Sequence, residues 1–429
     1  MKTAPRQLAG RHTARSPRPL GAILPALAVT SGFLGCDSPP DAPAVTVSDS
    51  AGTRIVTYAS LDDEAFPVID LEARVDTIGT VEGADEYLFR LLFSAELVPP
   101  GIVTADLFNS ELRLFDRSER FVSGVGGRGE GPGEFQTLTW MRGHGDSLFH
   151  AWDQWGNRLN TVRLTEAGLR HESSVQGSWE PGYNPVGVFS PGRVALDNAH
   201  TVPIPTSAGL QRFELVVSVM DLDADPSSKP LRHVAAVESA LRYVSEDQRL
   251  VPVPFQSIPR YFFADGMMWL KDGVNGEFRR VRMDGSLELV VRLPPGRQVT
   301  DRDVAAFRER NLRNVPDEEM PAARRRLDEV PSPSFFPSLG LMEVDDASGL
   351  VWLTPYPSGD EPVPWYVFDS LGCPVGRVNL PGDDTVLDIA GRRIAVRNQD
   401  EMDVERVLIH HLAESPSDRA GSGTSDCRR

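Results

Sequence analysis

The sequence has 429 residues, of which 61 are acidic and 44 are Lys or Arg, so its formal net charge is −17 at pH 7. Nucleic acids and anionic lipid surfaces are disfavoured as partners, because both repel a protein of this charge. Three cysteines are too few to form a disulfide framework, so we expect the fold to be held by packing. The length suffices for one large domain or two small ones.

Residues 1–35 have the order of an export signal. They contain five basic residues and no acidic one, and they include a mostly apolar run from Leu20 to Leu34 that is short for a membrane span. The run is followed by Gly35 and Cys36, a junction that resembles the lipobox of bacterial lipoproteins. The resemblance implies lipidation at Cys36 and a mature protein anchored at the cell envelope by lipid alone. The alternative is a secreted protein in which Cys36 is incidental.

Three further segments follow the export signal. The proline-rich residues 36–44 predict an extended tether, and residues 45–412 are expected to form the folded domain, which we expect to be monomeric. Residues 413–429, rich in Ser, Gly and Asp, predict a disordered tail. Because Cys427 lies in that tail, the sequence leaves open whether it is bridged to Cys373.

The stretch 124–135, GVGGRGEGPGEF, contains a formal G-x-G-x-x-G pattern. In a nucleotide-binding fold the last glycine opens a helix, whose N-terminal N–H groups hold the pyrophosphate. Here Gly131, Pro132 and Gly133 break any helix, and residues 135–140 alternate like a strand. The sequence therefore predicts a passage between two strand units, in which the glycines adopt positive φ angles.

A strand-rich unit recurs along the chain. The segment 266–270, GMMWL, recurs at 349–353 as GLVWL. In addition, five strand-like runs each end in an acidic residue that follows an apolar or turn residue. These acids are Asp116, Glu166, Asp221, Asp284 and Asp369. Most lie roughly 50 to 60 residues apart, a period typical of repeat architectures such as propellers.

The last interval is longer because it contains a helical stretch, predicted at about 299–330. Thr300 and Asp303 form a capping box, and apolar residues then recur at helical spacing. Without this insertion the period is kept, and six strand-rich units are predicted. They lie near residues 80–126, 128–177, 184–237, 256–295, 335–383 and 385–412. Residues 45–56 are expected to pair with the last unit and close the ring.

These features resemble the bacterial six-bladed β-propeller proteins related to NHL repeats, and in particular their exported, lipoprotein-like members. The resemblance is carried by GGRGEGPGEF at 126–135, by the unit from Thr104 to Asp116, and by WYVFD at 365–369. It implies an all-β fold, a six-bladed β-propeller with a helical insertion around residues 299–330. It implies no reaction.

No local motif for chemistry is present, and no catalytic, cofactor-binding or metal residue is predicted; the one assigned site is Cys36, for lipidation. Calcium is the one ion considered, because side-chain oxygens at blade ends can converge on the axis of a propeller. The positions concerned are Asp106, Asn109, Asp153, Asn157 and Asp197. The favoured alternative is that these side chains close β-turns onto their own backbone.

Two hypotheses of function remain. The favoured one is a non-catalytic binding or scaffold module at the cell envelope, for a protein, a peptide or a glycan. The alternative is a calcium-dependent hydrolase or lactonase with a site in the central funnel. The two differ in whether oxygen ligands converge in that funnel, which the sequence does not decide.

The lipidation of Cys36 is directly testable in a bacterial host fed with a labelled fatty acid. The wild-type protein is expected to incorporate the label and to partition with membranes, whereas Cys36→Ser is expected to lose both properties, because the acyl chains are its only anchor. Unchanged labelling in Cys36→Ser contradicts the prediction.

Overall fold

The computed structural model describes residues 44–61, 64–177, 182–199, 207–224, 231–273, 275–359, 362–382, 384–420 and 425–428. The predicted signal, Cys36 and almost all of the predicted tether lie outside these residues. Residues 43–429 form one compact unit, to which everything below refers. Among the described residues no helix is long and apolar enough to span a membrane.

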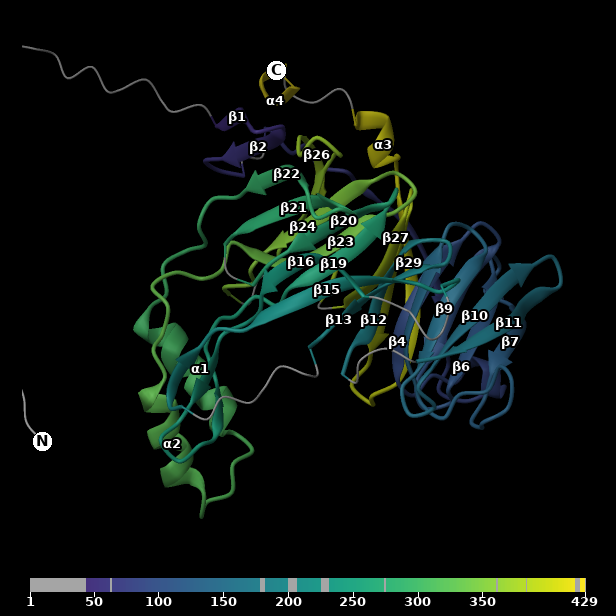
Figure 1. Ribbon diagram of the computed structural model, residues 1–429, viewed down its shortest axis with the longest axis horizontal. Helices are drawn as coiled ribbons and strands as arrows, with labels where there is room; N and C mark the ends of the chain where they lie inside the picture. Colours follow the sequence, from purple (N-terminus) through teal and green to yellow (C-terminus); the bar gives the residue numbers. More distant parts are fainter. Residues whose placement is uncertain are drawn as a thin grey trace, which may run out of the picture. The chain divides into compact units, whose positions relative to one another are not determined.

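Six sheets make up most of this unit, and each contains four antiparallel strands that form one blade; the sheet of the fourth blade has two further strands (Figure 1). The strands of the first three blades are β4 Leu92–Val98, β5 Gly101–Asp106, β6 Glu111–Asp116 and β7 Phe121–Gly126; β8 Leu138–His144, β9 Leu148–Asp153, β10 Arg158–Thr165 and β11 Gly168–Gln176; β12 Asn184–Ser190, β13 Arg193–Asp197, β15 Glu214–Asp221 and β16 Arg232–Glu238. Those of the last three are β19 Arg260–Ala264, β20 Met267–Lys271, β21 Glu277–Arg282 and β22 Leu287–Arg292; β23 Leu339–Asp345, β24 Leu350–Pro355, β25 Trp365–Phe368 and β26 Pro374–Val378; β27 Thr385–Ala390, β28 Arg393–Gln399, β29 Glu405–Leu412 and β3 Leu71–Ile78.

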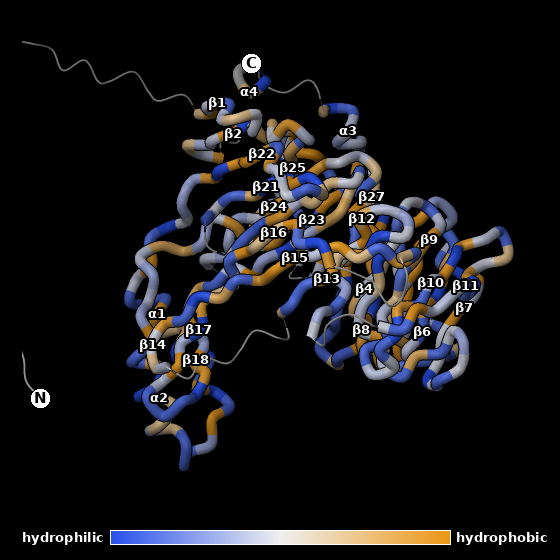
Figure 2. Tube along the Cα trace, in the orientation of Figure 1, coloured by the Kyte–Doolittle hydropathy of each residue, from blue (hydrophilic) through white to orange (hydrophobic). Residues whose placement is uncertain are grey.

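Burial along each blade follows from its place between two neighbours. All six residues of β5 are buried, and so are the middle four of β6, because both faces of these strands are covered. The outermost strand β7 alternates half-buried and exposed residues instead. Figure 2 shows the apolar residues concentrated along the strands in the same way.

The six sheets form a closed ring. The first strand of each blade contacts the first strand of the next, from β4 through β8, β12, β19 and β23 to β27, and β27 contacts β4. The last blade takes its fourth strand from the other end of the domain, since β3 pairs antiparallel with β29. Closure removes the sheet edges that would otherwise pair with other chains. The predicted six-bladed β-propeller is confirmed.

The prediction that residues 45–56 close the ring is wrong. They form β1 (Val45–Ser50) and the start of β2 (Thr53–Tyr58), and β2 runs parallel to β22 with Ile55 opposite Val290. Both strands thereby extend the fourth blade. The physical reason is burial, because Val56 and Tyr58 pack in the cluster of that blade while β3 already fills the closing position.

The glycine-rich stretch forms the passage between the first and second blades. Gly126 and Gly127 have φ angles of 123° and 102°, and Phe135 donates its N–H to the Gly127 carbonyl at 3.0 Å. A Cβ on Gly126 would approach the Ser110 carbonyl to 2.7 Å, so a side chain is excluded there. No helix follows, as the sequence predicts, and Phe135 is fully buried between the two blades.

The predicted insertion contains α1 (Asp301–Leu312) and α2 (Met320–Glu329), and Thr300 and Asp303 form the capping box. The helices pack against a small additional sheet that the sequence analysis did not predict. Its strands are β14 (Gly209–Gln211), β17 (Arg242–Val244) and β18 (Leu250–Pro252). Val251 and Val253 from this region bury their side chains against Leu327 and Val330. A short 3-10 helix, η1 (Asp85–Tyr87), precedes the first blade.

The C-terminal segment differs from the disordered tail that was expected. Its described residues include α3 (Pro416–Arg419) and α4 (Ser425–Arg428), and Cys427 is bonded to Cys373 with a Cα–Cα distance of 5.7 Å. Cys427 is fully buried against Tyr58 and the rest of the fourth-blade cluster. The buried Cys427 and its disulfide therefore hold the end of this polar C-terminal segment against the domain.

Removing the helices should leave the propeller folded, because the two ends of the insertion already meet. The Val299 N–H donates to the Ser334 carbonyl at 3.0 Å, so a short Gly-Ser link can replace residues 301–330. We expect the far-UV circular dichroism spectrum to lose helix and keep its β signal. We also expect a loss of about 2 kcal/mol of stability, because Val251 and Val253 lose their cover. Collapse of the β signal would contradict this prediction.

Candidate functional site

The first strands of the six blades run in the same direction around a central channel. Their N-terminal halves line one cavity of about 650 Å³, which we call the aromatic mouth after Trp140, Tyr261 and Phe262. Their C-terminal ends and the turns that follow line a second cavity of about 670 Å³. Because all six strands end at the same side, polar residues at these ends gather from across the whole domain.

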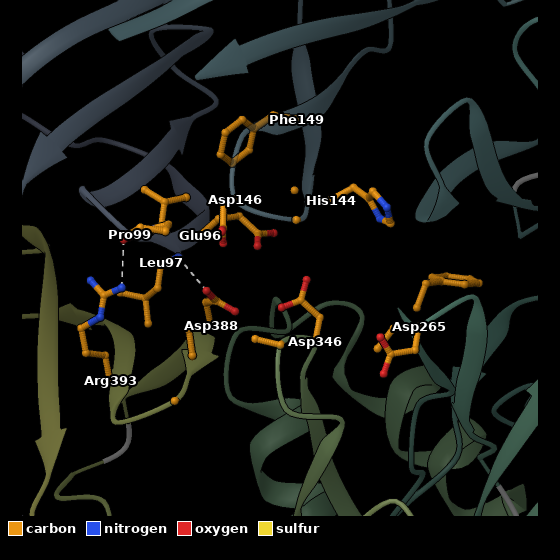
Figure 3. A pocket seen from close by; sticks show the side chains of 18 of the residues that line it. Glu96, Leu97, Pro99, His144, Asp146, Phe149, Asp265, Asp346, Asp388 and Arg393 are labelled. Carbon is orange, nitrogen blue, oxygen red and sulfur yellow. Dashed lines mark hydrogen bonds between the residues drawn. The ribbon is translucent and has the colours of Figure 1, made fainter. Parts of the chain in front are cut away.

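The second cavity, the acidic mouth, is lined by more acids than bases. Its charged residues are Glu96, Asp146, Asp265, Asp346 and Asp388, with Arg117 and Arg393. Figure 3 shows the carboxyl groups of Glu96, Asp346 and Asp388 turned toward a common space. These side chains come from blades one, five and six, so only the closed ring brings them together.

Local distortion of the first strands turns polar side chains toward the axis. In β27 the register against β28 shifts between Val386 and Asp388, and a bulge of this kind re-aims the side chains around it. Leu387 and Ile389 consequently pack into two different core clusters, while Asp388 faces the channel. Corresponding shifts occur in the first strands of several other blades.

The pair of Arg142 and Glu96 separates the two mouths. The guanidinium lies 3.1 Å from the Glu96 carboxylate, and its centre lies 5.3 Å from the centroid of the Phe262 ring. Only a gap of about 30 Å³ remains here. Burial by itself lowers the pKa of Arg142, but the charges of Glu96, Glu343 and Asp388 outweigh it and the pKa is raised. Arg142 therefore stays charged and holds the carboxylates around it.

Three carboxyl groups along the channel bind protons more tightly than usual. Burial raises the pKa of Glu343 to about 7, against the opposing charges of Arg142 and Arg260. For Asp346, burial and then the charges of Glu96 and Asp345 raise the pKa to about 6. Burial and then Glu96 also raise the pKa of Asp388, although the Leu97 N–H donates to its carboxylate at 2.6 Å. Glu343 and Asp346 therefore exchange protons near neutral pH.

The positions considered for calcium lie elsewhere, at the ends of the second strands. Asp106 accepts the N–H groups of Arg90 and Asn109 at 2.9 and 2.8 Å. Asp153 accepts those of Thr137 and Gly156 at 2.9 and 3.1 Å.

The remaining positions also bond locally. Asp197 accepts the Ala199 N–H and the Tyr261 hydroxyl, and Asn157 donates to the Gly177 carbonyl at 2.8 Å. The side chains of Asp106, Asp153, Asn157 and Asp197 thus bond within their own turn or to a neighbouring segment, and Asn109 takes part through its backbone N–H. In the described part of the chain no three His, Cys, Asp or Glu side chains lie together in a way that fits a metal ion. We therefore derive no step that passes through calcium.

The sequence analysis did not single out the residues of the channel. Glu96, Arg142 and Glu343 each occupy the fifth position of the first strand in their blades. A charged residue recurring at one place of an otherwise apolar strand was the available signal. It was missed because the first strands differ more in sequence than the Trp and Asp positions that define the repeat.

Fold and site together define a six-bladed β-propeller with a charged central channel. No family model matches the chain, and no curated protein does. Among solved structures it is similar to the calcium-binding protein regucalcin from Agrobacterium tumefaciens, at 12% identity and a TM-score of 0.36, over 81% of this chain and 96% of that one. A candidate 6-phosphogluconolactonase from Bacteroides uniformis matches at 13% identity and a TM-score of 0.31, over 75% and 86% of the two chains. Likeness at this level carries no activity over to the present chain.

The raised pKa of Glu343 predicts a pH-dependent stability. Between about pH 4.5 and 7, Glu343 keeps its proton in the folded state and loses it in the unfolded chain. The stability that the protonated carboxyl group contributes is therefore present at low pH and is lost as the pH rises through 7. Glu343→Gln should remove the loss, which is on the order of 2 kcal/mol. Chemical denaturation of both proteins at several pH values measures the difference between them.

Glu343→Gln must be compared with the wild type because His150 changes the pH dependence of stability in the opposite direction. Burial lowers its pKa to about 4, which makes the folded state more stable as pH rises from there to about 6.5. Glu318→Gln, at an exposed position of the insertion, is the matched control and should follow the wild type. Parallel curves for Glu343→Gln and the wild type would show that Glu343 titrates normally.

Proposed function

We propose that this protein is a non-catalytic binding module, exported and held at the cell envelope through Cys36, which binds a cationic group in the acidic mouth. The observation that carries the proposal is the convergence of five acidic side chains on one cavity of about 670 Å³. A recess lined by one sign of charge concentrates ligands of the opposite sign, and its low-dielectric walls strengthen the attraction.

The arrangement suits an ammonium or guanidinium group. Asp388 receives one hydrogen bond from the Leu97 N–H, and Asp146 and Asp265 lie exposed in the turns after β8 and β19. These carboxyl groups offer acceptors to a cation that carries several N–H donors. The partner is then a peptide, a protein or an amino-bearing glycan with such a group.

Binding should be coupled to protons. A bound cation favours the ionised form of Asp346 and Asp388, whose pKa values burial raises in the free protein. The ligand must therefore displace protons at low pH, and affinity should increase as the pH rises through about 6.

A hydrolase acting in the channel is the second candidate. The observation in its favour is that Asp346 in the acidic mouth and Glu343 in the aromatic mouth have raised pKa values of about 6 and 7, each of which suits proton transfer near neutral pH. Turnover of small lactones or esters that is lost in Asp346→Asn, together with a rise in melting temperature on adding calcium, would favour this candidate over the binding module.

The binding proposal is tested with cadaverine, a diamine without any anionic group. We expect calorimetric titration to show saturable binding to the wild type at pH 8 and weaker binding at pH 5. In Asp346→Asn and in Asp388→Asn the affinity should fall at least about fivefold, equivalent to a loss of about 1 kcal/mol.

The control is Asp301→Asn, which removes an exposed acid of α1 outside the channel and should bind like the wild type. Equal losses in the control and in the channel variants would point to general attraction by the acidic surface. The absence of any binding by cadaverine would refute the proposal that the mouth holds a cation.

A further inference from the structure

We infer that the ligand of the acidic mouth is zwitterionic and that Arg117 and Arg393 bind its carboxylate. The inference rests on the proposed function, since it assigns the second half of the same ligand. It follows from two guanidinium groups that line the mouth beside the acids but are not paired with them.

Both arginines bond to backbone carbonyls and to no carboxylate in the described part of the chain. Arg117 donates from Nε to the Pro99 carbonyl at 2.7 Å. Arg393 donates to the carbonyls of Gly101 and Val98 at 3.0 and 2.9 Å. Neutral acceptors orient the guanidinium groups, and the charges of Asp388 and Asp76 act on Arg393 only from beyond ion-pair distance. Both guanidinium groups therefore keep N–H donors available for an anion.

The fold fixes the two arginines on either side of one turn. Arg117 follows β6 of the first blade and Arg393 begins β28 of the sixth. Both donate hydrogen bonds to backbone carbonyls at the turn between β4 and β5. The backbone packs closely at this turn, since a Cβ on Gly101 would come within 1.8 Å of the Phe115 carbonyl. Burial and the neighbouring charge of Arg117 both lower the pKa of Arg393, which shows that the two cations repel each other. An anion beside them relieves that repulsion.

The carboxyl groups extend across the mouth from the side of the arginines to the far side. Figure 3 shows Arg393 beside Pro99 at one side with Asp388 next to it, Asp265 at the opposite side, and Asp346 between them. A ligand that spans the mouth thus meets arginines at one end only and acids at the other end. A dicarboxylate would be repelled by the acids, and a diamine would bind to the acids but place its second ammonium group near the arginines, so opposite charges on one molecule fit best.

A smaller cavity behind the arginines holds three acids, none of which forms an ion pair with either arginine in the described residues. This cavity of about 320 Å³ is lined by both arginines and by Asp76, Asp116 and Glu119. Asp76 is already engaged by Arg74 and His411, at 2.6 and 2.8 Å. Asp116 pairs with Arg120 at 2.9 Å. Asp76 and Asp116 are thus held in ion pairs with other side chains, and neither is within ion-pair distance of Arg117 or Arg393.

The test compares L-lysine with cadaverine, which is lysine without its carboxylate. Calorimetric titration at pH 8 should give lysine an affinity about tenfold higher than that of cadaverine for the wild type. In Arg117→Gln this preference should disappear while the affinity for cadaverine stays the same or rises. Arg117→Lys should restore part of the preference, because it keeps the positive charge without the planar fork.

Arg120→Gln is the matched control, since this neighbouring arginine is paired with Asp116, and it should keep the full preference. Melting curves of all variants establish that each is folded. If cadaverine binds and lysine binds no better, the inference is refuted while the cation site stands. If neither compound binds, the proposed function itself fails.

Discussion

The pairing of β3 with β29 is the contact on which the remaining structure depends. It joins residues 71–78 to residues 405–412, so nearly the whole domain becomes one closed loop. The entropic cost of closing a loop grows only with the logarithm of its length, which makes so distant a pairing affordable. Backbone bonds along two strands and the Asp76–His411 contact at 2.8 Å offset that cost. An open array would leave β27 and β4 apart, and the channel would not exist.

Closure also decides the electrostatics of the interior. Glu96, Arg142 and Asp388 would be ordinary solvated charges on separate strands, but the ring places them in one channel. The guanidinium of Arg142 then offsets part of the repulsion between the carboxylates, and protons held at raised pKa values offset more. A polar interior of this kind is costly to bury, which is why such clusters mark binding or catalytic sites more often than structural ones.

Lys271 is a second basic residue whose burial is offset by polar contacts, and it lies between two blades. Lys271 is almost fully buried and donates to Ser257 Oγ at 2.6 Å and to the Gly340 carbonyl at 2.7 Å. Burial lowers its pKa to about 7, and its contacts link the fourth and fifth blades. Where carbonyl and hydroxyl oxygens satisfy the ammonium, a charge is tolerated in the core and serves packing between blades.

The sequence by itself determined the elements whose causes are local. The capping box at Thr300 specifies where α1 begins, and the glycines at 126 and 127 specify a passage that only positive φ angles allow. The repeated pattern of apolar runs and turn aspartates likewise determined six blades. Tertiary structure decided which strands pair across long separations, so residues 45–56 joined the fourth blade, and Cys427 found a buried place that its polar neighbours did not indicate. It also decided the site, because a charge in a strand acquires its neighbours only when six distant strand ends meet around one axis.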